Sequence, residues 1–176
     1  MNKTVIFLDS GDTLIDEGTE VRDDRGVVQR AQFIPGAREL LETLAEKGYR
    51  VALVADGLAE SFRNMYAFLN MEDCFEQRIY SSDVGEDKPS PKMFQTAMDA
   101  MHLSCADKAR VVMVGNNVER DIAGANRFGL TTVLLDWSPR YRMQPQDAWE
   151  QADYVIHNPL ELLTLLETLE GNEVGA

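Results

Sequence analysis

The stretch that decides the fold is residues 4–13, TVIFLDSGDT, in which an apolar run ends in a loop of short polar residues. Residues 4–8 have the length and the β-branched and aromatic composition of a buried strand. Asp9 and Asp12 follow within one loop, and parallel α/β sheets bind ligands at the carboxyl ends of their strands. The stretch therefore predicts one strand of a parallel sheet with an acidic site at its end.

Similar apolar runs alternate with amphipathic stretches along the rest of the chain, which is typical of a parallel α/β sheet. Further strands are expected at Val51–Ala55, Gln77–Tyr80, Val111–Val114, Thr131–Leu135 and Tyr154–Ile156. Helices are expected at Pro35–Lys47, Ala59–Leu69, Pro91–Met101, Arg120–Phe128 and Pro159–Leu169. We predict a single domain over residues 1–170, a Rossmann-like three-layer α/β/α sandwich with a mostly parallel central sheet, followed by a flexible tail over 171–176.

Residues 16–33 interrupt this alternation. Two extended stretches, Glu20–Arg22 and Val27–Gln32, flank the turn sequence DDRG at 23–26, a pattern that favours a β-hairpin. Such a hairpin would stand as a flap beside the end of the first strand. Neither this segment nor the stretch around residues 83–89 is long enough for a separate cap domain, so no cap is expected.

The charge balance limits the partners. Among 176 residues there are 30 acidic and 17 basic side chains, a net charge of −13, which argues against nucleic acid and against an anionic membrane surface. The apolar run before Asp9 is too short for a signal-peptide core or a membrane span. Cys74 and Cys105 lack the spacing of a zinc site or a disulfide framework. A cytoplasmic protein is expected.

Four polar clusters fall at the carboxyl ends of predicted strands. They are Asp9–Thr13, Asp56-Gly57, Lys88 and Asn116–Asp121. Because these ends meet at one edge of a parallel sheet, the clusters predict a common site without reference to any motif.

With these clusters in place, residues 1 to about 169 resemble the haloacid dehalogenase superfamily of phosphoryl-transfer enzymes. The first motif of that family, Asp-x-Asp-x-Thr, is matched by Asp9 and Thr13, while Gly11 stands where the second Asp belongs. The resemblance implies that Asp9 is the nucleophile and that Lys88 neutralises the nucleophile and the phosphate. It also implies that the family's general acid/base is missing from its usual position.

Two other motifs also depart from the family pattern. Ala55 replaces the Ser or Thr that closes the second strand, and Asn116 replaces the first Asp of the fourth motif, while Asp121 remains. The resemblance implies a Mg²⁺ ion held by Asp9, the Gly11 carbonyl, Asn116 and Asp121. An amide ligates Mg²⁺ less strongly than a carboxylate, so weaker metal binding is expected.

Asp12 is a candidate replacement for the missing acid/base. Gly11 tolerates an unusual backbone turn, which could bring the Asp12 carboxylate inward; the alternative is an ordinary turn residue. General acid/base help is typically worth about 10²–10⁴-fold in rate. Without it, only good leaving groups such as acyl phosphates or anhydrides would depart readily.

Further phosphate contacts are expected from Ser10, Gly11, Asp56, Gly57 and Arg140. Asp56 precedes a predicted helix, so it is also a candidate N-cap, and the Gly57 backbone could approach an anion there. Arg140 lies in residues 136–142, which hold two Arg and two aromatic residues. Such guanidinium groups suit phosphate recognition, and the alternative is a loop packed on the domain's own acidic surface.

Together these features predict a Mg²⁺-dependent phosphatase that works through an aspartyl-phosphate at Asp9, with weak activity or activity restricted to good leaving groups. The expected substrate is a phosphorylated small molecule or a larger phospho-substrate, and a homo-oligomer could close the site. The alternative is a catalytically impaired protein of the same fold that binds a phospho-ligand. A phosphoacceptor receiver domain fits less well, because its acids and acceptor lie on different strands.

Overall fold

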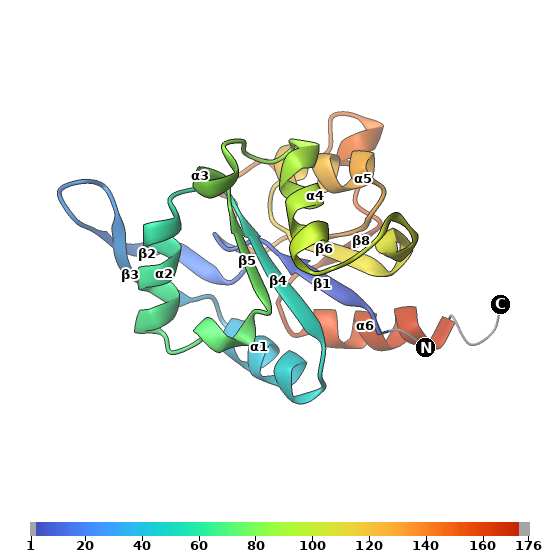
Figure 1. Cartoon of the computed structure of the whole chain (residues 1–176), viewed down its shortest axis with the longest axis horizontal. Coiled ribbons are helices and arrows are strands. Elements are labelled where there is room, and N and C mark those ends of the chain that lie inside the picture. The colour runs from blue at the N-terminus through green and yellow to red at the C-terminus, as the bar shows by residue number, and fades with distance from the viewer. Residues whose placement is uncertain (1–2, 173–176) are drawn as a thin grey trace.

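The strand that ends in Asp9 lies inside a six-stranded parallel sheet in the computed structural model, which describes residues 3–172 (Figure 1). This strand, β1 (Val5–Leu8), pairs with β4 (Arg50–Ala55) on one side and with β6 (Val111–Gly115) on the other. The remaining strands are β5 (Gln77–Tyr80), β7 (Thr131–Leu135) and β8 (Tyr154–Ile156), in the order β5-β4-β1-β6-β7-β8. The predicted strands are confirmed to within one residue at each end.

Helices cover both faces of the sheet, as Figure 1 shows. The long helices are α1 (Ala37–Glu46), α2 (Ala59–Phe68), α4 (Pro91–Ala100) and α6 (Glu161–Asn172). The predicted helix from Arg120 is a short π-helix, Val118–Ile122, continued by α5 (Ala123–Phe128). A four-residue helix, α3 (Ser81–Val84), was not predicted. The tail expected from residue 171 starts inside α6, and residues 173–176 lie outside the described part of the chain.

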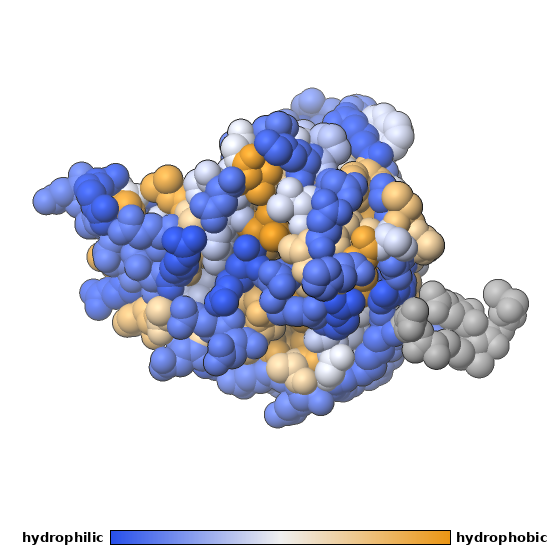
Figure 2. All heavy atoms as spheres, in the orientation of Figure 1, coloured by the Kyte–Doolittle hydropathy of each residue, from blue (hydrophilic) through white to orange (hydrophobic). Residues whose placement is uncertain are grey.

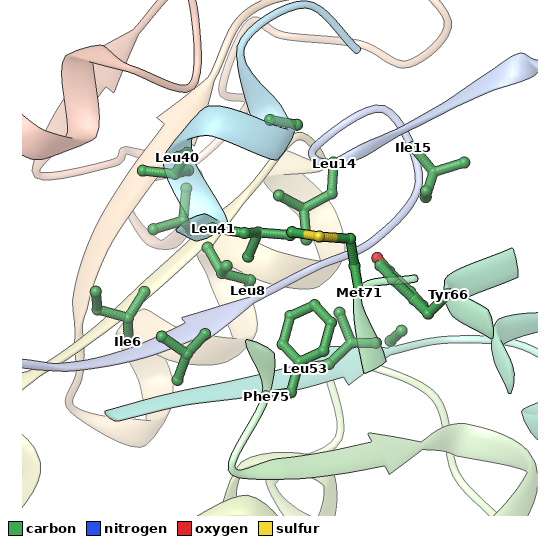
Figure 3. Close-up of a cluster of buried hydrophobic side chains, with 14 of the residues drawn as sticks. Ile6, Leu8, Leu14, Ile15, Leu40, Leu41, Leu53, Tyr66, Met71 and Phe75 are labelled. Atoms are coloured by element: carbon green, nitrogen blue, oxygen red, sulfur yellow. The ribbon is translucent and has the colours of Figure 1, made fainter. Parts of the chain in front are cut away.

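The core consists of two large apolar clusters on opposite sides of the sheet and a smaller third cluster that contains Val118, Ile122 and Leu134. Ile6 and Leu8 of β1 point to the side of α1, α2 and α6, where Leu41, Tyr66 and Phe75 pack around them (Figure 3). Val5 and Phe7 point to the opposite side, into a cluster that contains Met93, Phe94 and Met98 of α4. Because β1 is buried on both faces, it reads as an uninterrupted apolar run rather than an alternating one.

The hairpin is formed by β2 (Ile15–Arg22) and β3 (Val28–Phe33), which make a separate antiparallel sheet. It is fixed to α2: the Val28 N–H donates to Ser61 Oγ at 3.0 Å, and Asn64 Nδ2 donates to the Val28 carbonyl at 3.0 Å. Figure 1 shows the hairpin projecting beside α2. Within residues 3–172 it is the largest segment outside the three layers, and these residues contain no cap domain.

The surface is mainly hydrophilic on the face that Figure 2 shows, with smaller apolar areas between the hydrophilic side chains. None of the helices within residues 3–172 is long and apolar enough to span a membrane.

Candidate active site

Asp9 lies at the carboxyl end of β1, where its N–H donates to the Val114 carbonyl at 3.0 Å. One carboxylate oxygen, Oδ1, accepts a hydrogen bond from Lys88 Nζ at 2.9 Å. The other, Oδ2, accepts from Thr13 Oγ1 at 3.3 Å. Asp9 and Thr13 of the loop after β1 therefore meet Lys88, which follows β5 and the short helix α3 and not the strand end itself, and the Asp9 carboxylate is oriented from both sides.

Lys88 is buried and holds the acidic groups together. Its Nζ also lies 2.7 Å from Asp121 Oδ1 and donates to the Val54 carbonyl at 2.7 Å. Burial alone would lower the pKa of Lys88. The carboxylates of Asp121, Asp9 and Asp56 outweigh burial and raise the pKa above its usual value. The lysine is therefore a permanent positive charge beside the Asp9 carboxylate.

Asp121 is placed by close packing. A Cβ on Gly115 would lie 2.3 Å from Asp121 Oδ2, so only glycine leaves room for this carboxylate. The same oxygen accepts from the Asn117 N–H at 3.0 Å. Burial raises the pKa of Asp121, and the Asp9 charge acts in the same direction, although Lys88 opposes both. Both Asp121 oxygens thus have a partner within the protein, and Asp121 also lines the smaller cavity, so its role as a metal ligand stays a prediction.

Two adjoining cavities open at this edge of the sheet. The smaller, of about 80 Å³, is lined by Asp9, Asn116 and Asp121. The larger, of about 300 Å³, lies between the hairpin and α2, with Ile15, Val28 and Met65 among its apolar walls. The residues that line both are Gly11, Glu17, Asp56, Phe62 and Tyr141. The nucleophile candidate therefore faces a small polar space that continues into a larger one.

Asp12 does turn inward, but not toward Asp9's cavity. It is fully buried with φ of +49°, a left-handed conformation that Asp tolerates better than most residues. Its Oδ2 accepts from Arg140 Nε at 2.6 Å, and its Oδ1 accepts from the Glu17 N–H at 3.1 Å. Asp12 lines neither cavity. The acid/base role expected of Asp12 has no geometric support here, because both oxygens hold other parts of the protein.

Arg140 packs on the domain's own acidic surface, which was the alternative interpretation of residues 136–142. Besides Asp12, its Nε lies 3.5 Å from Glu17 Oε2, so the guanidinium packs on acidic groups of its own domain. Arg140 lines neither cavity in this structure. The direct phosphate contact expected of it is therefore not formed by this arrangement.

Glu17 was not singled out from the sequence, yet it lines both cavities. A Cβ on Gly11 would lie 2.1 Å from Glu17 Oε1 and 2.9 Å from Glu17 Cδ. Burial raises the pKa of Glu17 above its usual value. The nearby carboxylates of Asp12, Glu20 and Asp9 raise it further, and Arg140 lowers it. The site thus contains a carboxyl group directly above Gly11, supplied by β2.

The expected anion site around Asp56 and Gly57 differs from the prediction. Asp56 does not cap α2, whose N-cap position is Leu58; its Oδ1 instead accepts from the Lys88 N–H at 2.9 Å. The Gly57 N–H donates to Ser81 Oγ at 2.8 Å, so that donor is already used. Burial is the main cause that raises the pKa of Asp56. These residues shape the cavity and fix the Lys88 loop.

Ser10 is also directed into the protein. Its hydroxyl is fully buried and lies 2.9 Å from the Tyr66 hydroxyl. Burial strongly raises the pKa of Tyr66, so the phenol stays protonated. The Ser10 side chain therefore fastens the loop to α2 and does not offer its hydroxyl to a phosphate.

Asn116 is the best-placed polar side chain for a ligand. It is buried, and its Nδ2 has no hydrogen-bond partner within residues 3–172. The oxygen and nitrogen of an amide are assigned from the surrounding hydrogen bonds, so a rotated amide would present its oxygen instead. Because buried polar groups are nearly always paired, the free amide indicates that this cavity is completed by another species.

The donor set around the smaller cavity fits Mg²⁺. No cluster of three or more Asp, Glu, His or Cys side chains in the described part of the chain could hold an ion alone. Mg²⁺, however, commonly uses one or two carboxylates together with water and substrate phosphate. Asp9, Gly11 and Asn116 all line this cavity, and a carboxylate, a backbone carbonyl and a side-chain amide are oxygen donors of this kind.

Arg120 is a second lining residue that the sequence motifs did not point to. It lines the smaller cavity, its Nη1 lies 3.6 Å from Asp56 Oδ2, and its guanidinium lies over the Tyr141 ring, 5.3 Å from the ring centroid. Its position next to Asp121 in the fourth cluster was the available signal. Arg120 thus brings a cation to the smaller cavity.

Comparisons with known proteins give the class that this fold and site define. Residues 3–129 match the model of the haloacid dehalogenase-like hydrolases. The chain therefore belongs to the haloacid dehalogenase-like hydrolase family.

Among curated proteins, the chain is 32% identical over 140 residues to a glyceraldehyde 3-phosphate phosphatase of Pyrococcus furiosus, covering 80% of this chain and 57% of that protein. It is also 32% identical over 126 residues to a ribulose-1,5-bisphosphate 5-phosphatase of Halopiger xanaduensis, covering 72% of this chain and 49% of that protein. The chain thus spans about half the length of the curated relatives it matches.

Solved structures support the fold. A putative HAD-hydrolase, YfnB of Bacillus subtilis, superposes with a TM-score of 0.75 at 15% identity, covering 94% of this chain and 99% of that one. A HAD phosphatase of Thermococcus onnurineus superposes with a TM-score of 0.64 at 26% identity, covering 77% and 59%. The predicted fold class is confirmed.

Proposed function

We propose that this protein hydrolyses phosphate esters or anhydrides through an aspartyl-phosphate formed on Asp9. The observation that carries the proposal is the Asp9 carboxylate itself. It faces a small cavity at a strand end, and the fixed ammonium of Lys88 lies 2.9 Å from its Oδ1. Covalent catalysis by a carboxylate requires this combination of an accessible oxygen and a preorganised positive charge.

In this reaction Asp9 attacks phosphorus and Lys88 neutralises charge on the nucleophile and the transferred group. Arg120, on the same cavity wall, is a further partner for the phosphoryl oxygens. Bound Mg²⁺, held by Asp9, the Gly11 carbonyl and Asn116, would offset negative charge on the phosphoryl group. The structural neighbour YfnB was crystallised bound to magnesium, which supports this assignment.

The cavities favour a small phosphorylated substrate. The phosphoryl group fits the smaller space of about 80 Å³, and the rest of the molecule fits the adjoining space of about 300 Å³. The walls of the larger space combine apolar Phe62 with charged Glu20 and Arg22, which suits a compact polar metabolite. Two curated relatives are named as phosphatases of small phosphorylated molecules, in agreement with this class.

The first prediction tests the nucleophile. Hydrolysis of 4-nitrophenyl phosphate with added Mg²⁺ is expected for the wild type and absent in Asp9→Asn, because an amide cannot form the acyl phosphate. A matched control is Asp24→Asn, which makes the same charge change at the exposed tip of the hairpin. Equal hydrolysis by wild type and Asp9→Asn would contradict the proposal.

A second candidate function is binding of a phospho-ligand without turnover. The observation that favours it is the coincidence of three departures from the family pattern: Gly11 and Ala55 lack a polar side chain there, and Asn116 has an amide in place of a carboxylate. Calorimetric titration with a phosphate mimic separates the two functions. Tight binding together with Asp9-independent background hydrolysis would favour the binding function.

The homo-oligomer remains a prediction that sedimentation analysis would test.

A further inference from the structure

We propose that Glu17 is the general acid/base of this site and replaces, from the hairpin, the side chain that Gly11 lacks. This inference rests on the proposed phosphatase function and adds the residue that handles the proton. It also explains why a glycine at position 11 is compatible with catalysis.

The first argument is the place of the carboxyl group. A side chain at position 11 would begin at its Cβ, and a Cβ there would lie 2.1 Å from Glu17 Oε1. Real atoms never approach so closely, so Glu17 occupies the volume into which a residue at position 11 would project. Gly11 and Glu17 also line the smaller cavity together with Asp9. A carboxyl group is therefore present where the family pattern requires one, although it comes from a different element.

The second argument is that the Glu17 side chain is held in this place. Its Oε2 accepts from the Tyr141 hydroxyl at 3.4 Å and lies 3.5 Å from Arg140 Nε. Its backbone N–H donates to Asp12 Oδ1 at 3.1 Å. These contacts engage Oε2 and the backbone, and they leave Oε1 as the oxygen above Gly11. The side chain thus has two polar partners, both on Oε2, and they fix the direction of its carboxyl group.

The third argument concerns Asp12, which the motif places one position too late. Asp12 fixes both the Glu17 backbone and Arg140, which in turn contacts the Glu17 carboxyl group. Asp12 is thus a positioning residue. The exchange of Gly and Asp at positions 11 and 12 is accounted for as one change: position 11 makes room for Glu17, and position 12 holds it.

The proton balance of the reaction is complete with Glu17. In the first step an Asp9 oxygen bonds to phosphorus, the bond between phosphorus and the leaving oxygen breaks, and that oxygen takes the Glu17 proton. In the second step water attacks phosphorus, the Glu17 carboxylate takes a proton from the water, and the bond between phosphorus and Asp9 breaks. Inorganic phosphate leaves, and Asp9 and Glu17 return to their starting forms.

Glu17→Gln tests the proposal with two substrates. An alkyl phosphate needs a proton on its leaving oxygen, so its turnover is expected to fall by about 10²–10⁴-fold. With 4-nitrophenyl phosphate the first step needs no proton, so the variant should release a burst of nitrophenolate and then stall as the aspartyl-phosphate. Asp24→Asn, the matched control on the same hairpin, should behave as wild type on both substrates.

A relocation variant provides a second test that does not depend on the loss of activity. Gly11→Asp alone should push the Glu17 carboxyl group aside, because its Cβ would collide with Oε1 at the end of that flexible side chain. Combining Gly11→Asp with Glu17→Ala removes the collision and returns the carboxyl group to the nucleophile loop. The double variant is expected to recover alkyl phosphate turnover relative to Glu17→Ala.

The outcomes separate this inference from the proposed function. If wild type hydrolyses both substrates in an Asp9-dependent way and Glu17→Gln retains full alkyl phosphate turnover, Glu17 is not the acid/base and the phosphatase function stands. If wild type shows no Asp9-dependent turnover of either substrate, the phosphatase function and this inference both fail. Loss of alkyl turnover with a retained burst, and its recovery in the double variant, supports both.

Discussion

At the scale of single residues, the first motif has lost the Asp that Gly11 replaces, yet Asp9 keeps its contact with Lys88. Asp9 and Lys88 are in contact, as their places in the predicted site suggested, and their roles in the reaction stay predictions. The contacts of Asp12 could not be predicted, since they depend on Arg140, 128 residues away along the chain. The local sequence showed that an acid at position 12 is unusual, but it did not show that Asp12 would bind Arg140 and the Glu17 N–H.

Asp12→Asn tests this residue as a structural support. The amide keeps the size of the side chain and tolerates the left-handed backbone, but it loses the charge that pairs with Arg140. The free energy of unfolding should fall, because the buried Asp12 loses its charge while its partner Arg140 is partly exposed. Urea denaturation measures this, with Asp24→Asn as control. A positioning role also requires the pattern expected of Glu17→Gln, in which alkyl phosphate turnover falls while the nitrophenolate burst is retained. An unchanged urea midpoint together with wild-type alkyl turnover would contradict it.

At the scale of elements, the sheet was predictable because each parallel strand is buried on both faces and reads as a short apolar run. The hairpin was recognised from its turn, but its docking on α2 was not, because Ser61 and Asn64 contact β3 across distant sequence. The same limit applies to α2, whose first turn is served by side chains of the unpredicted α3: Ser82 Oγ accepts from the Ala59 N–H at 3.0 Å. Tertiary contacts of this kind leave no local pattern.

The contribution of the loop after β7 to the free energy of unfolding should depend on pH. Glu150 accepts from Arg142 Nη1 at 2.7 Å and from the Gln146 N–H at 2.6 Å, and these contacts lower its pKa from 4.5 to about 2. Because the folded pKa is below the unfolded one, this stabilisation is fully present above pH 4.5 and is lost as the pH falls toward 2. The free energy of unfolding of wild type minus that of Glu150→Gln should therefore shrink over this range. A difference that is constant with pH would contradict the assignment.

At the scale of the whole molecule, the site gathers negative charge in a protein that is already acidic. The smaller cavity is lined by Asp9, Glu17, Asp56 and Asp121, while Arg120 is its lining cation and Lys88 lies behind it. This charge is held together only in the folded chain. Any cation that binds here therefore favours the native state over the unfolded one.

Added Mg²⁺ should raise the melting temperature. By mass action a ligand at about 100 times its dissociation constant adds about 2.7 kcal/mol of stability. Thermal unfolding with increasing MgCl₂, and again after EDTA, measures the effect at constant ionic strength. Asn116→Ala should shift the response to higher Mg²⁺ concentration, because it removes one oxygen donor. A melting temperature that does not change at any MgCl₂ concentration of the titration would argue against a metal at this site.

The carboxyl group above Gly11 has a consequence for how chains are sorted into active and inactive members of a family. A search that demands an acid two residues after the nucleophile discards this chain as a degenerate copy. The relevant signature is instead Asp9, Gly11 and a glutamate six positions beyond the glycine on a hairpin strand. A genome survey could ask whether a carboxyl group lies near the nucleophile in the structure, whatever its position in the sequence. Such a survey would count chains of this kind among the enzymes.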